Sequence, residues 1–499
     1  MRRRYRRPAL LLAACAVLAG CGSTVSGIGT QAAGTNADGS LTSTSGSVTP
    51  NEVNASTSAT SASPQATTPT ARDGTPTDLG APGGTTSTTG TPTVDHSPIS
   101  VGLFVQADSS ALANSFGVSN LQNGNEPALA KAVVDQVNAT GGVNGRLLAP
   151  IFFVYDPSKQ SDIVLAQQQA CTMFTQDHHV VAVMLGWHGY TDHTLETCLV
   201  HKSVIVINSA GIETGDAQDV ARLTSYFSPP GLTLDREAVA YVDGLWDEGF
   251  FTAKARLGLI SIDDGAFHRA ANGALTAALK RHGLTLTDAS YYPPVVSTSD
   301  ASRQSAAVAN AVLRFKTDRV THVLFLQQGI NGPFYFMRAA DSQNYLPQYG
   351  LSTTDAPTAL APLVPVRQLA NSRGIGWLPV FDVTASKEDR SAPLRSACLR
   401  NLQKRTGETF QNRTVEYVGE SFCDSAAFFT YAASRNPGPI NSATFAAAVA
   451  NLNDTYRSPM VLNSSFESHR RDGVISYRNL RYDAACTCFV YQGTPHLIS

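Results

Sequence analysis

The sequence has few charged side chains and no long apolar segment. Only 15% of its 499 residues are Asp, Glu, Lys or Arg, and the formal net charge is −2. Without a basic excess, the chain lacks the positive field that attracts nucleic acid. The apolar run Ala9–Ala19 is shorter than the roughly 20 residues of a membrane-spanning helix. These absences argue against a nucleic-acid partner and against a membrane span in this run.

Signatures of catalysis are also missing. The sequence contains no Gly-x-Ser-x-Gly elbow, no Gly-Lys phosphate loop and no His-Glu-x-x-His pair. His188, His193 and Cys198 fall close together, but a metal site also needs convergent geometry. Surface histidines beside a structural disulfide are the alternative that we expect. The sequence therefore predicts no enzyme activity, no cofactor and no metal.

The N-terminus indicates export. An arginine-rich start precedes Ala9–Ala19, as in a secretory signal peptide. The segment Leu18-Ala19-Gly20-Cys21 resembles a bacterial lipobox, in which Cys21 would become the lipidated N-terminus. This resemblance implies a lipoprotein signal over residues 1–20 and an anchor at the outer face of the bacterial cell membrane. A plain signal peptide with an incidental cysteine is the alternative.

Residues 21–97 consist mostly of Ser, Thr, Gly, Pro and Ala. Such a segment buries too little apolar surface to offset the entropy of ordering, so we expect a disordered linker. As a flexible coil it would span roughly 50 Å. Its Ser/Thr-Pro content could equally reflect glycosylation.

From Ile99 onward the pattern is one of alternating strands and helices. Apolar residues recur at helical spacing over Pro127–Val137, Gly141-Gly142 can end that helix, and Leu147–Tyr155 has the composition of a strand. Together with the apolar run Ile99–Val105 this predicts a βαβ unit and a parallel sheet. Near the C-terminus, Asp472-Gly473 predicts a hairpin turn.

The βαβ segment resembles a known family. Asn138-x-x-Gly-Gly-Val-x-Gly-Arg146, followed by a strand and Asp156, is similar to the first unit of type I periplasmic binding proteins. It is most similar to the branched-chain amino acid/amide receptors of ABC transporters. The resemblance implies an α/β fold of two doubly wound Rossmann-like lobes joined by a three-segment hinge. We expect residues 98–226 and 351–460 in lobe 1, and residues 227–350 and 461–499 in lobe 2.

The resemblance also implies a function. The protein would be a lipid-anchored, monomeric receptor of an ABC importer that closes its lobes on a small polar or amide/amino-acid-like ligand. Its partners would be the permease and, through the permease, the ATPase. Gln327 and Gln328 stand where amino-acid receptors carry an acid, which favours an amide or another weakly charged molecule. The alternative is a ligand-sensing or structural surface lipoprotein that has kept the fold but lost transport.

Ligands of open α/β sheets bind beyond the carboxyl ends of the strands. In the resembled receptors, hydroxyls and backbone N–H groups of these loops hold a carboxylate or amide, and Ser209-Ala210 matches one such loop. We favour Trp187 as a wall of the pocket, although its ring could instead pack on the neighbouring helix. The expected ligand-binding residues are Gln106, Ser109, Trp187, His188, Ser209, Ala210, Tyr226, Asp264, Phe267 and Gln327.

The sequence contains 8 cysteines. Cys15 would leave with the signal peptide and Cys21 would take the lipid, so six would remain. An even set on an exported chain suggests disulfides, although spacing alone permits many pairings. We expect the pairs Cys171–Cys198, Cys398–Cys423 and Cys486–Cys488.

Overall fold

The computed structural model describes residues 96–107, 122–186, 192–212, 215–295, 300–388, 393–436, 438–467 and 470–498. Within these ranges the strands form one sheet of five and one sheet of seven. None of the helices in these ranges is long and apolar enough to cross a membrane. The expected signal peptide, Cys21 and nearly all of the expected linker lie outside the described residues.

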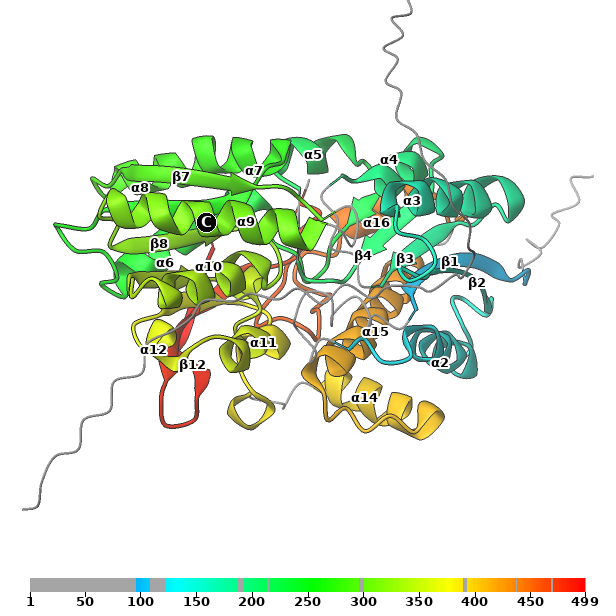
Figure 1. The fold of residues 1–499 in the computed structure, drawn as a ribbon. Helices are drawn as coiled ribbons and strands as arrows, with labels where there is room; N and C mark the ends of the chain where they lie inside the picture. The colour runs from blue at the N-terminus through cyan, green and yellow to red at the C-terminus, as the bar shows by residue number, and fades with distance from the viewer. Residues whose placement is uncertain are drawn as a thin grey trace, which may run out of the picture. The chain divides into compact units, whose positions relative to one another are not determined.

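The first sheet is parallel throughout, with the strand order β2-β1-β3-β4-β5. Its strands are β1 (Ile99–Gln106), β2 (Leu148–Tyr155), β3 (Ala182–Leu185), β4 (Ile205–Asn208) and β5 (Tyr226–Phe227). Its helices are α2 (Glu126–Ala139), α3 (Ile163–Thr172), α4 (Thr194–His201), α5 (Ala217–Arg222) and, from later in the chain, α14 (Pro393–Thr406), α15 (Arg413–Ala433) and α16 (Ser442–Ala450). Helix α3 contacts α4, whereas α2 contacts α14 and α15, so helices cover both faces of the sheet (Figure 1). All residues of β3 and β4 are buried, as expected for a sheet covered on both faces.

The predicted βαβ unit is confirmed, since β1, α2 and β2 follow one another and β1 pairs with β2 in parallel. Asn125 caps α2, because its side chain accepts a hydrogen bond from the Ala128 N–H over 3.1 Å. Gly142 has a φ of 69°, and a Cβ there would stand 2.0 Å from the Arg146 carbonyl oxygen. Only glycine fits this turn.

The second sheet has the strand order β12-β11-β10-β9-β8-β6-β7. Its strands are β6 (Leu257–Ile262), β7 (Leu286–Tyr292), β8 (His322–Leu326), β9 (Gln348–Leu351), β10 (Arg373–Gly376), β11 (Ser476–Asp483) and β12 (Cys488–Leu497). Its helices are α6 (Leu234–Asp247), α7 (Gly265–Ala270), α8 (Thr276–Arg281), α9 (Asp300–Thr317), α10 (Asn331–Ser342), α11 (Pro357–Leu360), α12 (Val366–Leu369) and α13 (Pro379–Asp382). Helix α6 contacts α7 and α8, whereas α9 contacts α10, so this sheet is also doubly wound.

The structure differs from the sequence analysis in two places. Strand β10 pairs in parallel with β9 in the second sheet, although residues 351–460 were expected in lobe 1. The chain therefore leaves the second sheet only after β10, and the other lobe boundaries stay a prediction.

The predicted hairpin turn at Asp472-Gly473 is wrong, because β11 and β12 pair across residues 484–487. Asp472 is instead buried, and its carboxylate accepts hydrogen bonds from Thr233 and Arg236.

The three expected disulfides are present. Cys171–Cys198 joins α3 to α4, and Cys398–Cys423 joins α14 to α15. Both therefore tie together neighbouring helices that pack on the first sheet. Cys486–Cys488 lies at the turn between β11 and β12.

Candidate functional site

Loops at the carboxyl ends of the two sheets contact each other. Gly211, after β4, lies so close to Leu378, after β10, that a Cβ on this glycine would stand 2.7 Å from the Leu378 Cδ2. The Leu234 N–H at the start of α6 donates to the Gly215 carbonyl over 3.1 Å. Because ligands of α/β sheets bind beyond these strand ends, the site is expected near this junction.

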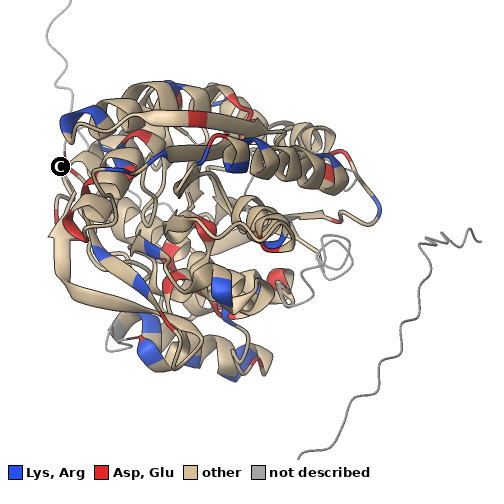
Figure 2. Ribbon diagram, turned by 60° about the vertical axis from the view of Figure 1, so that its left-hand side comes forward, with Lys and Arg blue, Asp and Glu red and all other residues tan. Residues whose placement is uncertain are grey.

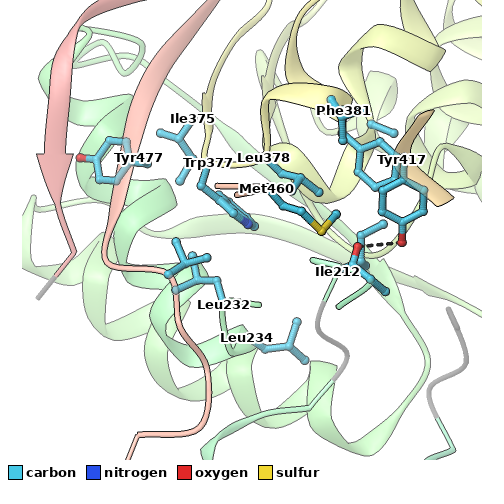
Figure 3. Close-up of a cluster of buried hydrophobic side chains, with 14 of the residues drawn as sticks. Ile212, Leu232, Leu234, Ile375, Trp377, Leu378, Phe381, Tyr417, Met460 and Tyr477 are labelled. Atoms are coloured by element: carbon cyan, nitrogen blue, oxygen red, sulfur yellow. Dashed lines mark hydrogen bonds between the residues drawn. The ribbon is translucent and has the colours of Figure 1, made fainter. Parts of the chain in front are cut away.

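An apolar cluster occupies part of this junction (Figure 3). Trp377 and Leu378 follow β10 and are fully buried. Tyr417 on α15 packs against Phe381, with ring centroids 4.4 Å apart. Its hydroxyl donates to the Ala210 carbonyl over 2.7 Å. The cluster therefore joins α15 of the first sheet to the loop after β4 and to the segment that follows β10.

A cavity of about 450 Å³ lies between helices of the two sheets. Helices α4 and α5 form its wall on the first sheet, and the start of α7 forms its wall on the second. Its volume suits a small molecule. The lining of the cavity includes charged and titratable residues, among them Asp192, His193, Asp219, Arg222, Asp264 and Arg269.

Arg269 connects the two walls of this cavity. Its Nη2 lies 3.0 Å from Asp216 Oδ1 and 2.8 Å from Asp219 Oδ2. Asp216 also caps α5 by accepting a hydrogen bond from the Asp219 N–H over 2.9 Å. Both carboxylates are buried, whereas the Arg269 side chain is 39% exposed. Arg222 pairs with Asp219 as well, so positive and negative groups alternate along the cavity wall.

The expected first-lobe residues that the structure describes point inward. Gln106 and Ser209 are buried, and Tyr226 belongs to a core cluster. The Ala210 N–H donates to the Asn208 side chain over 2.9 Å, and its carbonyl is bonded to Tyr417, so its backbone groups already have partners. Three expected residues, Ser109, Trp187 and His188, lie outside the described residues.

The expected second-lobe residues differ in their positions. Asp264 lines the cavity and caps α7, since its side chain accepts a hydrogen bond from the Ala266 N–H over 2.9 Å. Phe267 is fully buried in the core. Gln327 is also buried, and it accepts a hydrogen bond from the Tyr292 hydroxyl over 2.8 Å. Of these residues only Asp264 reaches the cavity.

Buried acids at the carboxyl end of the second sheet are residues that the sequence analysis missed. Asp355, after β9, accepts a hydrogen bond from the Gln327 amide. Glu237 on α6 accepts from the hydroxyls of Ser352 and Thr354, each over 2.8 Å. Burial raises the pKa of Asp355 well above its ordinary value and that of Glu237 to about 7. Ser352 is 115 positions from Glu237, so no local sequence pattern could have revealed the contact.

The described part of the chain offers no group of side chains that would suit a metal ion. Among the residues that the structure describes, no group of three or more His, Cys, Asp and Glu side chains could hold a metal ion. Cys198, one member of the His/Cys group in the sequence, is bonded to Cys171. Figure 2 shows basic and acidic residues interspersed along the helices, in keeping with the small net charge.

Comparisons with known proteins agree with this fold. A family model described as periplasmic binding protein matches residues 116–477. A branched-chain amino acid ABC transporter protein from Thermus thermophilus with bound valine has a TM-score of 0.57 and 14% identity, covering 80% of this chain and 97% of that one. A substrate-binding protein from Desulfitobacterium hafniense in complex with Leu has a TM-score of 0.53 and 12% identity, covering 79% and 100%. A solute-binding protein from Rhodopseudomonas palustris with 3,4-dihydroxybenzoic acid has a TM-score of 0.56 and 11% identity, covering 81% and 98%. A search of curated proteins found no match.

Proposed function

This chain belongs to the periplasmic binding protein family, and we propose that it is the extracytoplasmic solute receptor of an ABC importer. The observation that carries the proposal is the cavity of about 450 Å³, which has walls from both sheets. A ligand that contacts both walls would stabilise the closed arrangement over the open one, and this difference would signal occupancy to the permease. The protein would act as a monomer and without chemistry.

The ligand that we propose is a small polar molecule with a carboxylate and an ammonium or amide group. Arg222 and Arg269 offer donors to a carboxylate, and Asp192 and Asp264 offer acceptors to the other group. Trp187, five positions before Asp192 in the sequence, is proposed as an apolar wall. Valine, Leu and 3,4-dihydroxybenzoic acid, which the similar structures contain, all carry a carboxyl group.

A thermal-shift screen with leucine, valine, their amides and 3,4-dihydroxybenzoate tests this proposal. Binding to the folded state raises the melting temperature, so at least one carboxylate is expected to do so. Arg222→Met should then weaken binding about 10- to 100-fold, because a charge-assisted hydrogen bond is lost. The matched control is Arg281→Met on α8, since Arg281 pairs with Asp243 and does not line the cavity. If none of these compounds raised the melting temperature, the proposal would fail and a structural lipoprotein would be favoured.

We also propose that Cys21 is lipidated and holds the protein at the outer face of the cell membrane, with the 21–97 segment as a tether. The proposal rests on the lipobox-like Leu18–Cys21 sequence. Cys21→Ser is expected to move the protein from the membrane fraction to the soluble fraction or the medium, because the acyl chains supply the membrane affinity. Fractionation followed by immunoblotting measures this, with Cys15→Ser as the control. A processed Cys21→Ser protein that stayed with the membrane would contradict it.

A further inference from the structure

The third disulfide differs from the other two in its surroundings. Cys486 lies in the exposed turn between β11 and β12. This turn forms the end of the red hairpin in Figure 1. The partner of Cys486, Cys488, begins β12 and is 3% exposed. Cys171, by contrast, is buried in a core cluster against which Cys198 packs partly buried, and Cys398 and Cys423 pack partly buried against the main core. An external thiol can therefore approach Cys486 more readily than those four sulfurs.

This disulfide also contributes little to holding the fold together. The ladder already pairs Tyr482 with Phe489 and Asp483 with Cys488. Within the turn, the Ala485 N–H donates to Asp483 Oδ1 over 2.9 Å. The bonded cysteines are only 2 positions apart, against 27 and 25 for the helix-joining disulfides. Because cross-link stabilisation grows with the length of the closed loop, the hairpin should stay formed when this bond is broken.

We propose that Cys486–Cys488 is a thiol–disulfide exchange site, which an extracytoplasmic dithiol reductant opens while the chain stays folded. A thiolate of the dithiol attacks the exposed Cys486 Sγ, and the bond to Cys488 Sγ breaks. The electron pair leaves on Cys488, which takes up a proton. The second thiolate of the dithiol then attacks the dithiol's own sulfur in the mixed disulfide. The bond to Cys486 Sγ breaks, and Cys486 leaves as a thiolate that takes up a proton. The dithiol is oxidised to its disulfide, and the protein gains two thiols.

The test uses the full folded chain and a limiting amount of dithiothreitol, followed by alkylation and peptide mapping by mass spectrometry. Cys486 is expected to be alkylated at least about tenfold faster than Cys171, Cys198, Cys398 and Cys423, because attack depends on access. Reduced thioredoxin serves as a second probe. If alkylation shows a fast phase with both reductants, a protein dithiol is assigned as the source of electrons. If the fast phase appears with dithiothreitol alone, a small dithiol is assigned as the source.

The double variant Cys486→Ser/Cys488→Ser is the matched control. It should lose the fast alkylation phase and keep the melting temperature of the parent within about 2 °C, since the hairpin ladder remains. Equal alkylation rates for all three disulfides would overturn the proposal. So would a double variant that no longer unfolds cooperatively, because the bond would then be a structural cross-link.

Discussion

Replacing Arg395 with methionine is expected to lower the free energy of unfolding by about 3–5 kcal/mol. The Arg395 side chain is 6% exposed and pairs with Glu388, Glu416 and Glu420, which are all nearly inaccessible. Methionine keeps much of the length of the side chain but removes its charge. Arg413 would then be left as the partner of Glu388 and Glu416, and Glu420 would lose its ion pair. A buried carboxylate that loses its cation is costly because neither water nor a counter-charge replaces the lost interaction.

Urea denaturation at pH 8 measures this loss. Arg281→Met is the control, because the Arg281 side chain is 50% exposed and exposed pairs contribute at most about 1 kcal/mol. The difference between the Arg395 variant and the parent should shrink at lower pH. Burial already raises the pKa of Glu420 to about 7, and protonation removes the charge that Arg395 balanced. A loss below about 1 kcal/mol at pH 8 would contradict the role of Arg395 as the charge partner of this cluster.

Replacing Glu237 with glutamine is expected to change the pH dependence of stability. Burial raises the pKa of Glu237 from 4.5 to about 7 in the folded protein. Between these values the folded state holds a proton that the unfolded state has lost. The free energy of unfolding therefore falls as the pH rises through this window, by about 3 kcal/mol in total. This loss is complete above pH 7, where Glu237 is ionised in the folded protein as well. Glutamine stays neutral, so the variant should escape this loss.

Urea denaturation at pH 5 and pH 8 measures the effect. The stability of Glu237→Gln relative to the parent should rise by about 3 kcal/mol between the two pH values. The hydroxyls of Ser352 and Thr354 can donate to the amide oxygen as they do to the carboxylate, so the local hydrogen bonds remain. Asp247→Asn is the control, because Asp247 is exposed on the same helix. A relative stability that did not change with pH would show that Glu237 is already neutral at pH 8 or that solvent reaches it.

Local signals explain which parts of the fold were predictable. The βαβ unit followed from apolar spacing and from the glycines at 141 and 142, which act within a few residues. The β10 strand was assigned to the wrong sheet, because a four-residue run such as Arg373–Gly376 carries no information about its partner strand. Asp472-Gly473 has the composition of a hairpin turn, but Asp472 is held by Thr233, which lies 239 positions away. Contacts between residues so far apart in the sequence leave no local sequence pattern.

The candidate site was predictable to a smaller extent. Asp264 follows β6 and was selected by the rule that ligands of α/β sheets bind beyond the carboxyl ends of the strands. The structure places it in the lining of the cavity, and its contact with a ligand stays a prediction. The same rule also selected Phe267 and Gln327, which the structure shows buried. The rule identifies loops but not the direction of each side chain, because that direction depends on the packing of neighbouring helices. Arg222 and Arg269 were missed for the same reason, since both lie on helices and not in strand-end loops.

The sequence by itself determined the alternation of strands and helices and the turn at Gly142, and it supplied an even set of six cysteines for disulfides. These features depend on backbone conformation and on spacing along the chain. Only the tertiary structure decided which charges meet, such as Arg269 with Asp216 and Arg395 with Glu420. The energy of an ion pair depends on distance and burial in space, and neither can be read from positions along the chain.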